Sequence, residues 1–288
     1  MGRRRSTIRV DHWAGVGRLS ESTIGPERFR PCGERILQSF TKEKIAKLAG
    51  RVILTLMQED VNSQIAIDGP AAAGKSTVAA LVAERLGLPC INTGNMYRAL
   101  TWLALARRVD PEKQPGQVVA LLPELDLDYA PDHAGRPVLM VDGQPLAAEV
   151  IRTPEVAAKV SFMARIPEVR HWLVAKQRQS ARFGPIVMEG RDIGTVVFPH
   201  ARYKFFVTAS PEVRARRRLA QPGEVIDSAT VESVAAEIAR RDEIDQNRAV
   251  SPLRPADDAE IIDTDHLNAE QVAELIAGKV NDFGSFSN

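Results

Sequence analysis

From residue 64 to residue 280, short apolar runs alternate with amphipathic stretches. Apolar runs of four to eight residues between turn residues are typical of buried strands, and apolar positions at helical spacing are typical of helices. The chain therefore predicts five core strands, at residues 64–67, 88–91, 185–188, 203–208 and 261–263. Strands that alternate with helices in this way favour an α/β fold with a parallel sheet and helices on both faces.

Helical spacing of apolar residues marks the segments between these strands. After the first strand, Val78, Leu81, Val82 and Leu86 recur on one helical face, and Gly87 stands where a glycine commonly ends a helix. We expect further helices at residues 99–107, 149–164, 168–182, 212–219, 231–248 and 268–280.

The pattern changes between the second and third core strands. Residues 125–129, 137–142 and 144–146 look like three short strands, and the dipeptide Asp142-Gly143 between the last two is a strong hairpin signal. The sequence thus predicts a small antiparallel subdomain inserted into the alternation of strands and helices.

Composition narrows the class of protein without deciding its function. The chain has 288 residues, of which 44% are hydrophobic and 26% charged, and its net charge is +1. We therefore expect a globular protein that binds neither nucleic acid nor membranes, since the charge is balanced and no apolar run reaches the ~18 residues of a membrane span. Two distant cysteines, Cys32 and Cys90, favour a reducing, cytoplasmic setting over a disulfide.

Residues 1–63 differ from the rest of the chain. They begin with Arg3, Arg4 and Arg5, are rich in Gly and Ser, and show little apolar periodicity before residue 41. A basic, disordered extension is the interpretation we favour, and contact with RNA is the alternative. Because Met57 lies just before the first core strand, we also hypothesise that residues 1–56 are dispensable or never made.

The turn after the first strand carries the clearest chemical signal. Gly69 and the run Gly74-Lys75-Ser76 match the spacing of a nucleotide-phosphate loop, in which small residues let backbone N–H groups surround oxyanions. Lys75 is placed to reach the β- and γ-phosphates, and the Ser76 hydroxyl to join the shell of a Mg²⁺ ion. A Gly/Ala turn that binds nothing is the alternative, which the preceding strand and the following helix disfavour. The expected nucleotide-binding residues are Gly69, Pro70, Ala71, Ala72, Ala73, Gly74, Lys75, Ser76 and Thr77.

Polar residues also follow the second and third strands. Thr93 and Arg98 come after the second, and the run 189–195, with Arg191 and Asp192, after the third. Because ligands of open α/β sheets bind at the carboxyl ends of the strands, these residues are candidates for a site. Taken by itself, Arg98 is better explained as a surface arginine.

Two later helices carry clustered charges. Arg214, Arg216, Arg217 and Arg218 spread around the helix at 212–219, so at most one or two can face one ligand, and a solvated basic face is the alternative. Pro222-Gly223 then suits the tip of a lid. On the helix at 231–248, the residues Arg241, Asp245 and Arg248 share one stripe, which ion pairing within the helix would also explain.

Taken together, the sequence from about residue 63 to residue 280 resembles the bacterial-type cytidylate kinases. This resemblance implies a P-loop three-layer fold over residues 64–288, with a five-stranded parallel core sheet. It also implies a nucleoside-monophosphate-binding insert at about 120–182 and a lid at about 211–232. The motifs that carry it are 67–76, Thr93-Gly94 with Met96-Tyr97-Arg98, 190–199, Arg241-Asp242, 247–250 and Pro252-Leu253.

The resemblance implies transfer of the γ-phosphoryl group of ATP, as its Mg²⁺ complex, to CMP or dCMP by a monomer. By matching position, Lys75, Arg191, Arg217 and Arg218 would be catalytic, the last two on the lid, and Ser76 would bind the metal. The expected substrate contacts are Arg98, Arg191 and Arg248 for the acceptor phosphate, Ser161, Arg170 and Asp192 for cytosine, and Arg241 and Asp245 for ribose, with Thr93 beside them.

Two positions depart from the family pattern. Asn92 stands where Asp is usual, and Glu189 where Asp is common, which affects the expected placement of Mg²⁺ or water and not the reaction class. Two alternatives stay open on sequence grounds. One is another small-molecule kinase, acting on UMP, AMP or shikimate, and the other is a nucleotide-binding regulator that transfers nothing.

Overall fold

A computed structural model describes residues 63–221 and 229–282, all within the unit Arg51–Asn288. The predicted basic extension up to residue 62, the hypothetical start at Met57, and the proposed lid tip at Pro222-Gly223 lie outside the described residues.

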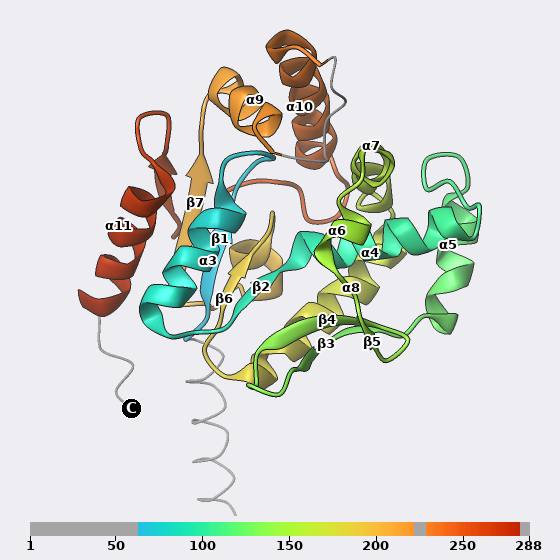
Figure 1. Cartoon of the computed structure of the whole chain (residues 1–288), viewed down its shortest axis with the longest axis horizontal. Coiled ribbons are helices and arrows are strands. Elements are labelled where there is room, and N and C mark those ends of the chain that lie inside the picture. Colours follow the sequence, from blue (N-terminus) through green and yellow to red (C-terminus); the bar gives the residue numbers. More distant parts are fainter. Residues whose placement is uncertain (1–62, 222–228, 283–288) are drawn as a thin grey trace, which may run out of the picture. The chain divides into compact units, whose positions relative to one another are not determined.

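The core is the five-stranded parallel sheet that the sequence predicts (Figure 1). Its strands lie in the order β2-β6-β1-β7-β8, so β1, the first described strand, occupies the centre. Ile65 of β1 pairs with Val187 on one side and Tyr203 on the other. The bounds are β1 Ile65–Asp68, β2 Cys90–Asn92, β6 Val187–Glu189, β7 Tyr203–Thr208 and β8 Glu260–Asp263.

Helices cover both faces of this sheet. The described helices are α3 (Lys75–Leu86), α4 (Thr93–Ala106), α5 (Pro115–Leu121), α6 (Ala148–Ile151), α7 (Pro154–Met163), α8 (Pro167–Gln179), α9 (Pro211–Leu219), α10 (Val231–Gln246) and α11 (Ala269–Asp282), with short 3₁₀ turns at Leu122–Glu124 and Ser180–Phe183.

Side chains of the central strand alternate between two hydrophobic clusters. Ile65 and Ile67 pack with Val78 of α3 and Ile276 of α11, whereas Ala66 packs in the cluster on the other side. This period of two is what a strand buried on both faces requires. All four residues of β1 are buried, which explains why the run reads as continuously apolar in the sequence.

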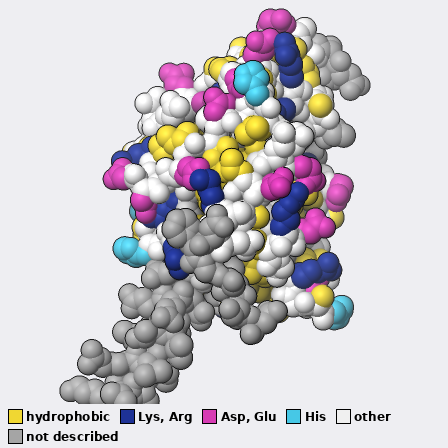
Figure 2. Space-filling view, turned by 90° about the vertical axis from the view of Figure 1, so that its left-hand side faces the viewer, with side chains coloured by type: hydrophobic (Ala, Val, Ile, Leu, Met, Phe, Trp, Pro, Cys, Tyr) yellow, Lys and Arg dark blue, Asp and Glu magenta, His cyan; other side chains and the backbone are white. Residues whose placement is uncertain are grey.

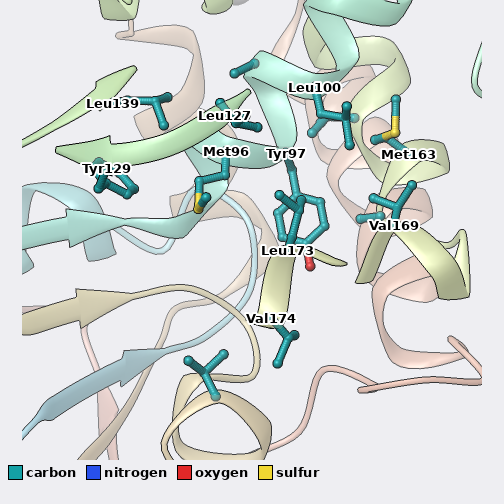
Figure 3. Packing of buried hydrophobic residues seen from close by; sticks show 14 of the residues in the cluster. Met96, Tyr97, Leu100, Leu127, Tyr129, Leu139, Met163, Val169, Leu173 and Val174 are labelled. Atoms are coloured by element: carbon teal, nitrogen blue, oxygen red, sulfur yellow. The ribbon is translucent and has the colours of Figure 1, made fainter. Parts of the chain in front are cut away.

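The second cluster joins the sheet to the inserted subdomain. Met96, Tyr97 and Leu100 of α4 pack with Leu173 of α8 and with Leu127 of the hairpin, as Figure 3 shows. Tyr129 adds a polar link, since its Oη donates to the carbonyl oxygen of Asn92 at 2.8 Å. The insert is therefore anchored directly behind the end of β2.

The predicted antiparallel insert is confirmed. Strands β3 (Leu127–Pro131), β4 (Pro137–Val141) and β5 (Gln144–Pro145) form a separate three-stranded sheet. Asp142 and Gly143 join β4 to β5 with φ angles of 49° and 72°. Both angles are positive, as the favoured two-residue hairpin turn requires.

The helices of the insert differ from the prediction. The helix expected at 149–164 is two helices, α6 and α7, because Pro154 lacks an N–H and Thr153 begins a new helix by accepting from the amide of Val156 at 3.3 Å. The helix α5 was not predicted. Neither was the short π-helix Ile193–Val197, which follows Asp192.

On the face shown in Figure 2, acidic and basic side chains of the described residues are interspersed. Large hydrophobic side chains are exposed at three described positions, of which Ile261 on the edge strand β8 is the most open, at 61%. Among the helices described, none is both long and apolar enough to cross a bilayer.

We predict that Gly69→Ala prevents stable folding. A Cβ at Gly69 would lie 2.0 Å from the carbonyl oxygen of Val207 in β7, and the φ angle of 147° is unfavourable for a side chain. The expected loss in the free energy of unfolding is on the order of 3 kcal/mol or more, measurable by chemical denaturation.

Gly278→Ala is the matched control, because nothing lies within 4 Å of its Cβ position in α11. Alanine there should stabilise the helix by about 0.5–1 kcal/mol. A Gly69→Ala protein as stable as the unmodified chain would contradict the close approach of the loop to β7.

Candidate active site

One cavity of about 200 Å³ opens at the carboxyl ends of β1, β2 and β6. The turns after these three strands line it together with α7, α8, α9 and α10. The sequence-predicted residues that it brings together are Ala71, Ala72, Gly74, Lys75, Ser76, Thr77, Thr93, Arg98, Ser161, Arg170, Arg191, Asp192, Arg218, Arg241, Asp245 and Arg248.

The turn between β1 and α3 forms one wall of this cavity. Ala72 and Gly74 both have positive φ angles, 59° and 90°, which bend the backbone around a hollow at the start of α3. Gly69, Pro70 and Ala73 complete the turn without lining the cavity. Backbone N–H groups in such a turn, at a helix N-terminus, favour an anion.

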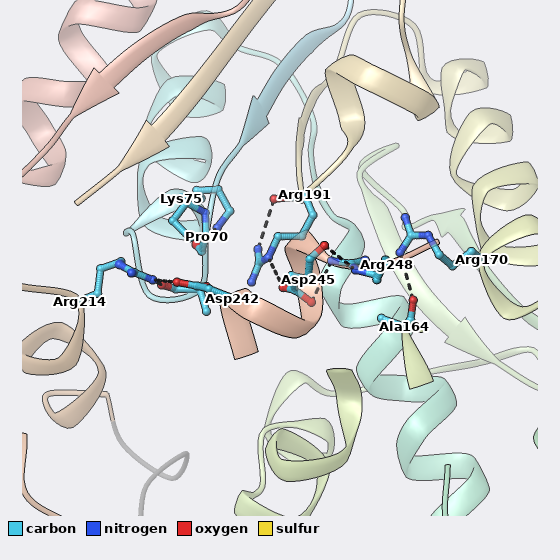
Figure 4. A network of polar contacts seen from close by, with 11 residues as sticks. Pro70, Lys75, Ala164, Arg170, Arg191, Arg214, Asp242, Asp245 and Arg248 are labelled. Atoms are coloured by element: carbon cyan, nitrogen blue, oxygen red, sulfur yellow. Dashed lines mark hydrogen bonds and ion pairs between the residues drawn. The ribbon is translucent and has the colours of Figure 1, made fainter. Parts of the chain in front are cut away.

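Lys75 lies in the first turn of α3 and is buried. Its Nζ donates to the carbonyl oxygen of Pro70 at 2.6 Å (Figure 4). Burial, reinforced by the positive charge of Arg191, lowers the pKa of Lys75 to about 7. A phosphate group in the cavity would oppose both effects and favour the charged ammonium.

Three polar side chains meet beside the phosphate loop. The Ser76 hydroxyl donates to Glu189 Oε1 at 2.5 Å and accepts from Asn92 Nδ2 at 3.2 Å. Hydroxyl and carboxylate oxygens are the donors that Mg²⁺ prefers, so this cluster fits the ion. The two positions that depart from the family pattern thus contact the predicted metal ligand directly.

Asp68, the last residue of β1, ties the phosphate loop to the segment after β6. Its buried carboxylate accepts from the amides of Ile193 and Gly194, at 2.8 and 2.7 Å. These two amides begin the π-helix Ile193–Val197. Arg178 of α8 holds its other end by donating to the carbonyl oxygens of Val196 and Val197. Burial raises the pKa of Asp68 to about 7, although both amide bonds act in the opposite direction. The orientation of Arg191 and Asp192 therefore depends on two distant elements.

Asp192 and Arg170 form a buried ion pair deep in the cavity. Arg170 Nη2 contacts Asp192 Oδ2, and only 1% and 6% of the two side chains are exposed. Ser161 of α7 and Tyr97 of α4 line the same end, with Arg170 lying 5.6 Å from the centre of the Tyr97 ring. A planar, polar group would find here both donors and acceptors.

Asp245 of α10 is the acidic centre of an arginine cluster. It accepts from Arg191 Nε at 3.1 Å and from Arg248 Nη2 at 2.9 Å, as Figure 4 shows. Although burial opposes its ionisation, Arg248, Arg191 and Arg241 together hold the pKa of Asp245 below its ordinary value. The predicted helix at 231–248 ends at Gln246, so Arg248 lies just beyond α10 and pairs back to Asp245 three residues earlier. Both side chains also line the cavity.

Thr93 and Gly190 hold the ends of β2 and β6 together. Thr93 Oγ1 donates to the carbonyl oxygen of Glu189 at 2.9 Å. A Cβ at Gly190 would lie 2.6 Å from that same Oγ1, so the contact requires glycine. The Thr93 hydroxyl, which we expected to contact the substrate, thus donates its proton to the backbone instead.

Charge in the cavity is strongly unbalanced. Eight basic and three acidic side chains line it. Burial, followed by repulsion from Arg191, lowers the pKa of Arg241 to about 9. A cavity with this excess of buried positive charge is suited to an anionic ligand.

Comparison with known proteins agrees with this geometry. The family model described as cytidylate kinase matches residues 65–282. The chain belongs to the cytidylate kinase family.

Curated members of the cytidylate kinase family are similar over most of this chain. A cytidylate kinase of Pelotomaculum thermopropionicum is 47% identical over 75% of this chain and 95% of its own length. A cytidylate kinase of Geobacillus is 44% identical over 77% of this chain and 97% of its own length. Among solved structures, a gluconokinase from Sinorhizobium meliloti covers 76% of this chain and 92% of its own, with 14% identity and a TM-score of 0.39.

In this member of the cytidylate kinase family, the arginines of α9 have different surroundings. Arg218 lines the cavity, whereas Arg216 is exposed and pairs with Glu212. Arg217, expected at the catalytic centre, contacts the backbone of the phosphate loop instead of lining the cavity. Its guanidinium donates to the carbonyl oxygen of Ala73 at 3.3 Å, to Thr264 Oγ1 at 2.8 Å and to the carbonyl oxygen of Thr264 at 2.7 Å. It is not among the described residues that line the cavity.

Sequence reasoning gave no role to several lining residues. Asn95 and Tyr97 lie between the predicted site residues Thr93 and Arg98, so their position in the chain could have suggested them. Arg152, at the junction of α6 and α7, had no such signal, because it precedes a helix start outside every recognised motif.

We predict that Asp245→Asn destabilises the protein. Without the carboxylate charge, Arg191, Arg241 and Arg248 repel one another in a buried setting, and breaking such a pair removes about 3 kcal/mol of unfolding free energy. Thermal and chemical denaturation would measure the loss.

Glu212→Gln is the control, because it breaks the exposed pair with Arg216 at 2.6 Å. Its expected effect is below about 1 kcal/mol. Equal stability of the Asp245→Asn and Glu212→Gln proteins would show that Asp245 does not hold the arginines together.

Proposed function

We propose that this chain transfers the γ-phosphoryl group of ATP to the phosphate of CMP or dCMP. The observation that carries the proposal is that a single cavity holds both the phosphate loop with Lys75 and the arginine cluster around Asp245, with the Arg170–Asp192 pair beyond it. Membership of the cytidylate kinase family supports the same reaction.

The donor side would be the turn from Gly69 to Thr77. Its N–H groups and Lys75 would hold the triphosphate of ATP, while Ser76, Glu189 and Asn92 would hold Mg²⁺ directly or through water. When bound, the ion would neutralise charge on the β- and γ-phosphates. Glu189 supplies the negative charge of this cluster, since Asn92 contributes a neutral amide.

On the acceptor side, Arg98, Arg191 and Arg248 would surround the phosphate of CMP. That phosphate is ionised at neutral pH and is itself the nucleophile, so the reaction needs no strong general base. What the protein must supply is alignment of two anions that repel each other, together with compensation of their charge. Arg218, from α9, would add a positive charge from the lid side.

The Arg170–Asp192 pair, with Ser161, would read the base. Arg170 already occupies Asp192 Oδ2, which leaves Oδ1 for the amino group at N4 of cytosine. Arg170 would in turn donate to N3 or O2. Uracil presents the opposite polarity, with a donor at N3 and an acceptor at O4. The donor Arg170 would then face the N3–H donor, and the acceptor Asp192 would face the O4 acceptor. Arg241 and Asp245 would contact the ribose.

The first test is a coupled assay with ATP, Mg²⁺ and each nucleoside monophosphate. We expect turnover with CMP and dCMP, much less with UMP and AMP, and none after the metal is chelated. Preferential turnover of UMP or AMP would identify a different monophosphate kinase. Nucleotide binding without any transfer would support the regulator instead.

The second test replaces Asp192. We predict that Asp192→Ala lowers the ratio of CMP to UMP turnover by about tenfold or more, because each mispaired buried polar group is worth about 1–3 kcal/mol. Asp128→Ala is the control, since Asp128 pairs with Arg182 at 2.9 Å on the exposed side of the hairpin. An unchanged ratio in a folded Asp192→Ala protein would show that this carboxylate does not select the base.

A further inference from the structure

The peptide between Ala71 and Ala72 leads into a left-handed turn of the phosphate loop. Ala72 has a φ angle of 59°, a left-handed conformation that is unfavourable for a residue with a Cβ. A trans peptide is planar, and its N–H points away from its C=O. Whatever fixes the carbonyl of Ala71 therefore also aims the N–H of Ala72.

A buried arginine from α9 contacts that carbonyl. Arg214 Nη1 donates to the oxygen of Ala71 at 3.2 Å, and its Nε donates to the oxygen of Ala209 at 3.0 Å. Ala71 and Ala72 both line the cavity, whereas Arg214 is not among the described residues that line it. Because the Ala71 carbonyl points toward Arg214, the N–H of Ala72, on the opposite side of the same peptide, points away from Arg214.

The same guanidinium is fixed in turn by α10. Arg214 Nη1 contacts Asp242 Oδ2 at 2.5 Å, and both side chains are about nine-tenths buried (Figure 4). Asp242 follows Arg241 directly and precedes Asp245 by three residues, so it shares a helix with the residues facing the acceptor side. One ion pair thus links the loop on the donor side to the helix on the acceptor side.

We propose that Arg214 is a positioning residue for the donor phosphates. It holds the Ala71 carbonyl, and with it the left-handed turn at Ala72, in the shape that binds a triphosphate before the nucleotide arrives. Asp242 keeps its guanidinium in place. The rate predictions rest on the proposed function, whereas the binding predictions rest only on the phosphate loop.

The test is Arg214→Gln, with Arg216→Gln as a matched control. Both variants remove one positive charge and one ion pair from α9, but Arg216 is exposed and pairs with Glu212 on its own helix. The probe is a non-hydrolysable ATP analogue with Mg²⁺, titrated by calorimetry. We expect Arg214→Gln to weaken binding by about tenfold or more, as loss of a charged hydrogen bond predicts, and Arg216→Gln to leave it unchanged.

Steady-state kinetics separates positioning from a general structural role. We expect the KM for ATP to rise by a similar factor, while the KM for CMP at saturating ATP changes by less than about threefold. A folded Arg214→Gln protein that binds the analogue as tightly as the unmodified chain would overturn the proposal. If the unmodified chain bound the analogue but did not phosphorylate CMP, the proposed function would fail and the binding test would still apply.

Two further variants guard against misfolding. Arg214→Lys keeps the charge beside Asp242 but lacks the fork that reaches both carbonyls, so it should weaken binding in the same direction by several fold. Ala72→Gly makes the left-handed turn accessible without support, so Arg214→Gln should have a smaller effect in an Ala72→Gly background. An undiminished effect there would show that Arg214 does not act through this turn.

Discussion

The concentration of like charge in one cavity is the constraint on which the rest of this structure depends. Eight basic side chains converge there against three carboxylates, and the depressed pKa of Arg241 reflects the resulting burial and repulsion. The fold withstands this because the arginines are held by elements far apart in sequence, and because Asp245 pairs with Arg191 and Arg248 while Asp192 pairs with Arg170. An anionic ligand would relieve the repulsion among these arginines, so ligand binding would stabilise the arrangement of the site.

The parallel sheet makes this convergence possible. All five strands end on the same side, so the turns after β1, β2 and β6 meet, although contacts from the turn after β6 reach residues 125 and 96 positions away in the other two. Hydrogen bonds between turns then fix their relative positions. Asp68 links the first turn to the third, and Thr93 links the second to the third. The geometry of the cavity is set by these few backbone contacts as much as by the side chains that face it.

The sequence predicted the parts of this arrangement that depend on local pattern. The five strands, the phosphate loop and the Asp142-Gly143 hairpin are each encoded within a few residues, and the structure contains all of them. The direction of Arg217 was not predictable, because its partner Thr264 lies 47 residues away on another strand end. The π-helix likewise depends on Asp68 and Arg178, which hold its two ends from distant segments. At Thr153-Pro154 a local signal did exist, but apolar periodicity across it suggested one continuous helix.

The central position of β1 has a consequence for how the chain is made. The side chain of Gln64 accepts a hydrogen bond from the amide of Ile186, 122 residues later, and β7 follows later still. On the ribosome, this buried strand is therefore synthesised before its neighbours and must wait, with both edges open, until they emerge. Sheets built from such distant pairings form slowly and leave apolar segments exposed in the meantime. Productive cotranslational folding thus depends on protecting the nascent β1 until β6 and β7 have been translated.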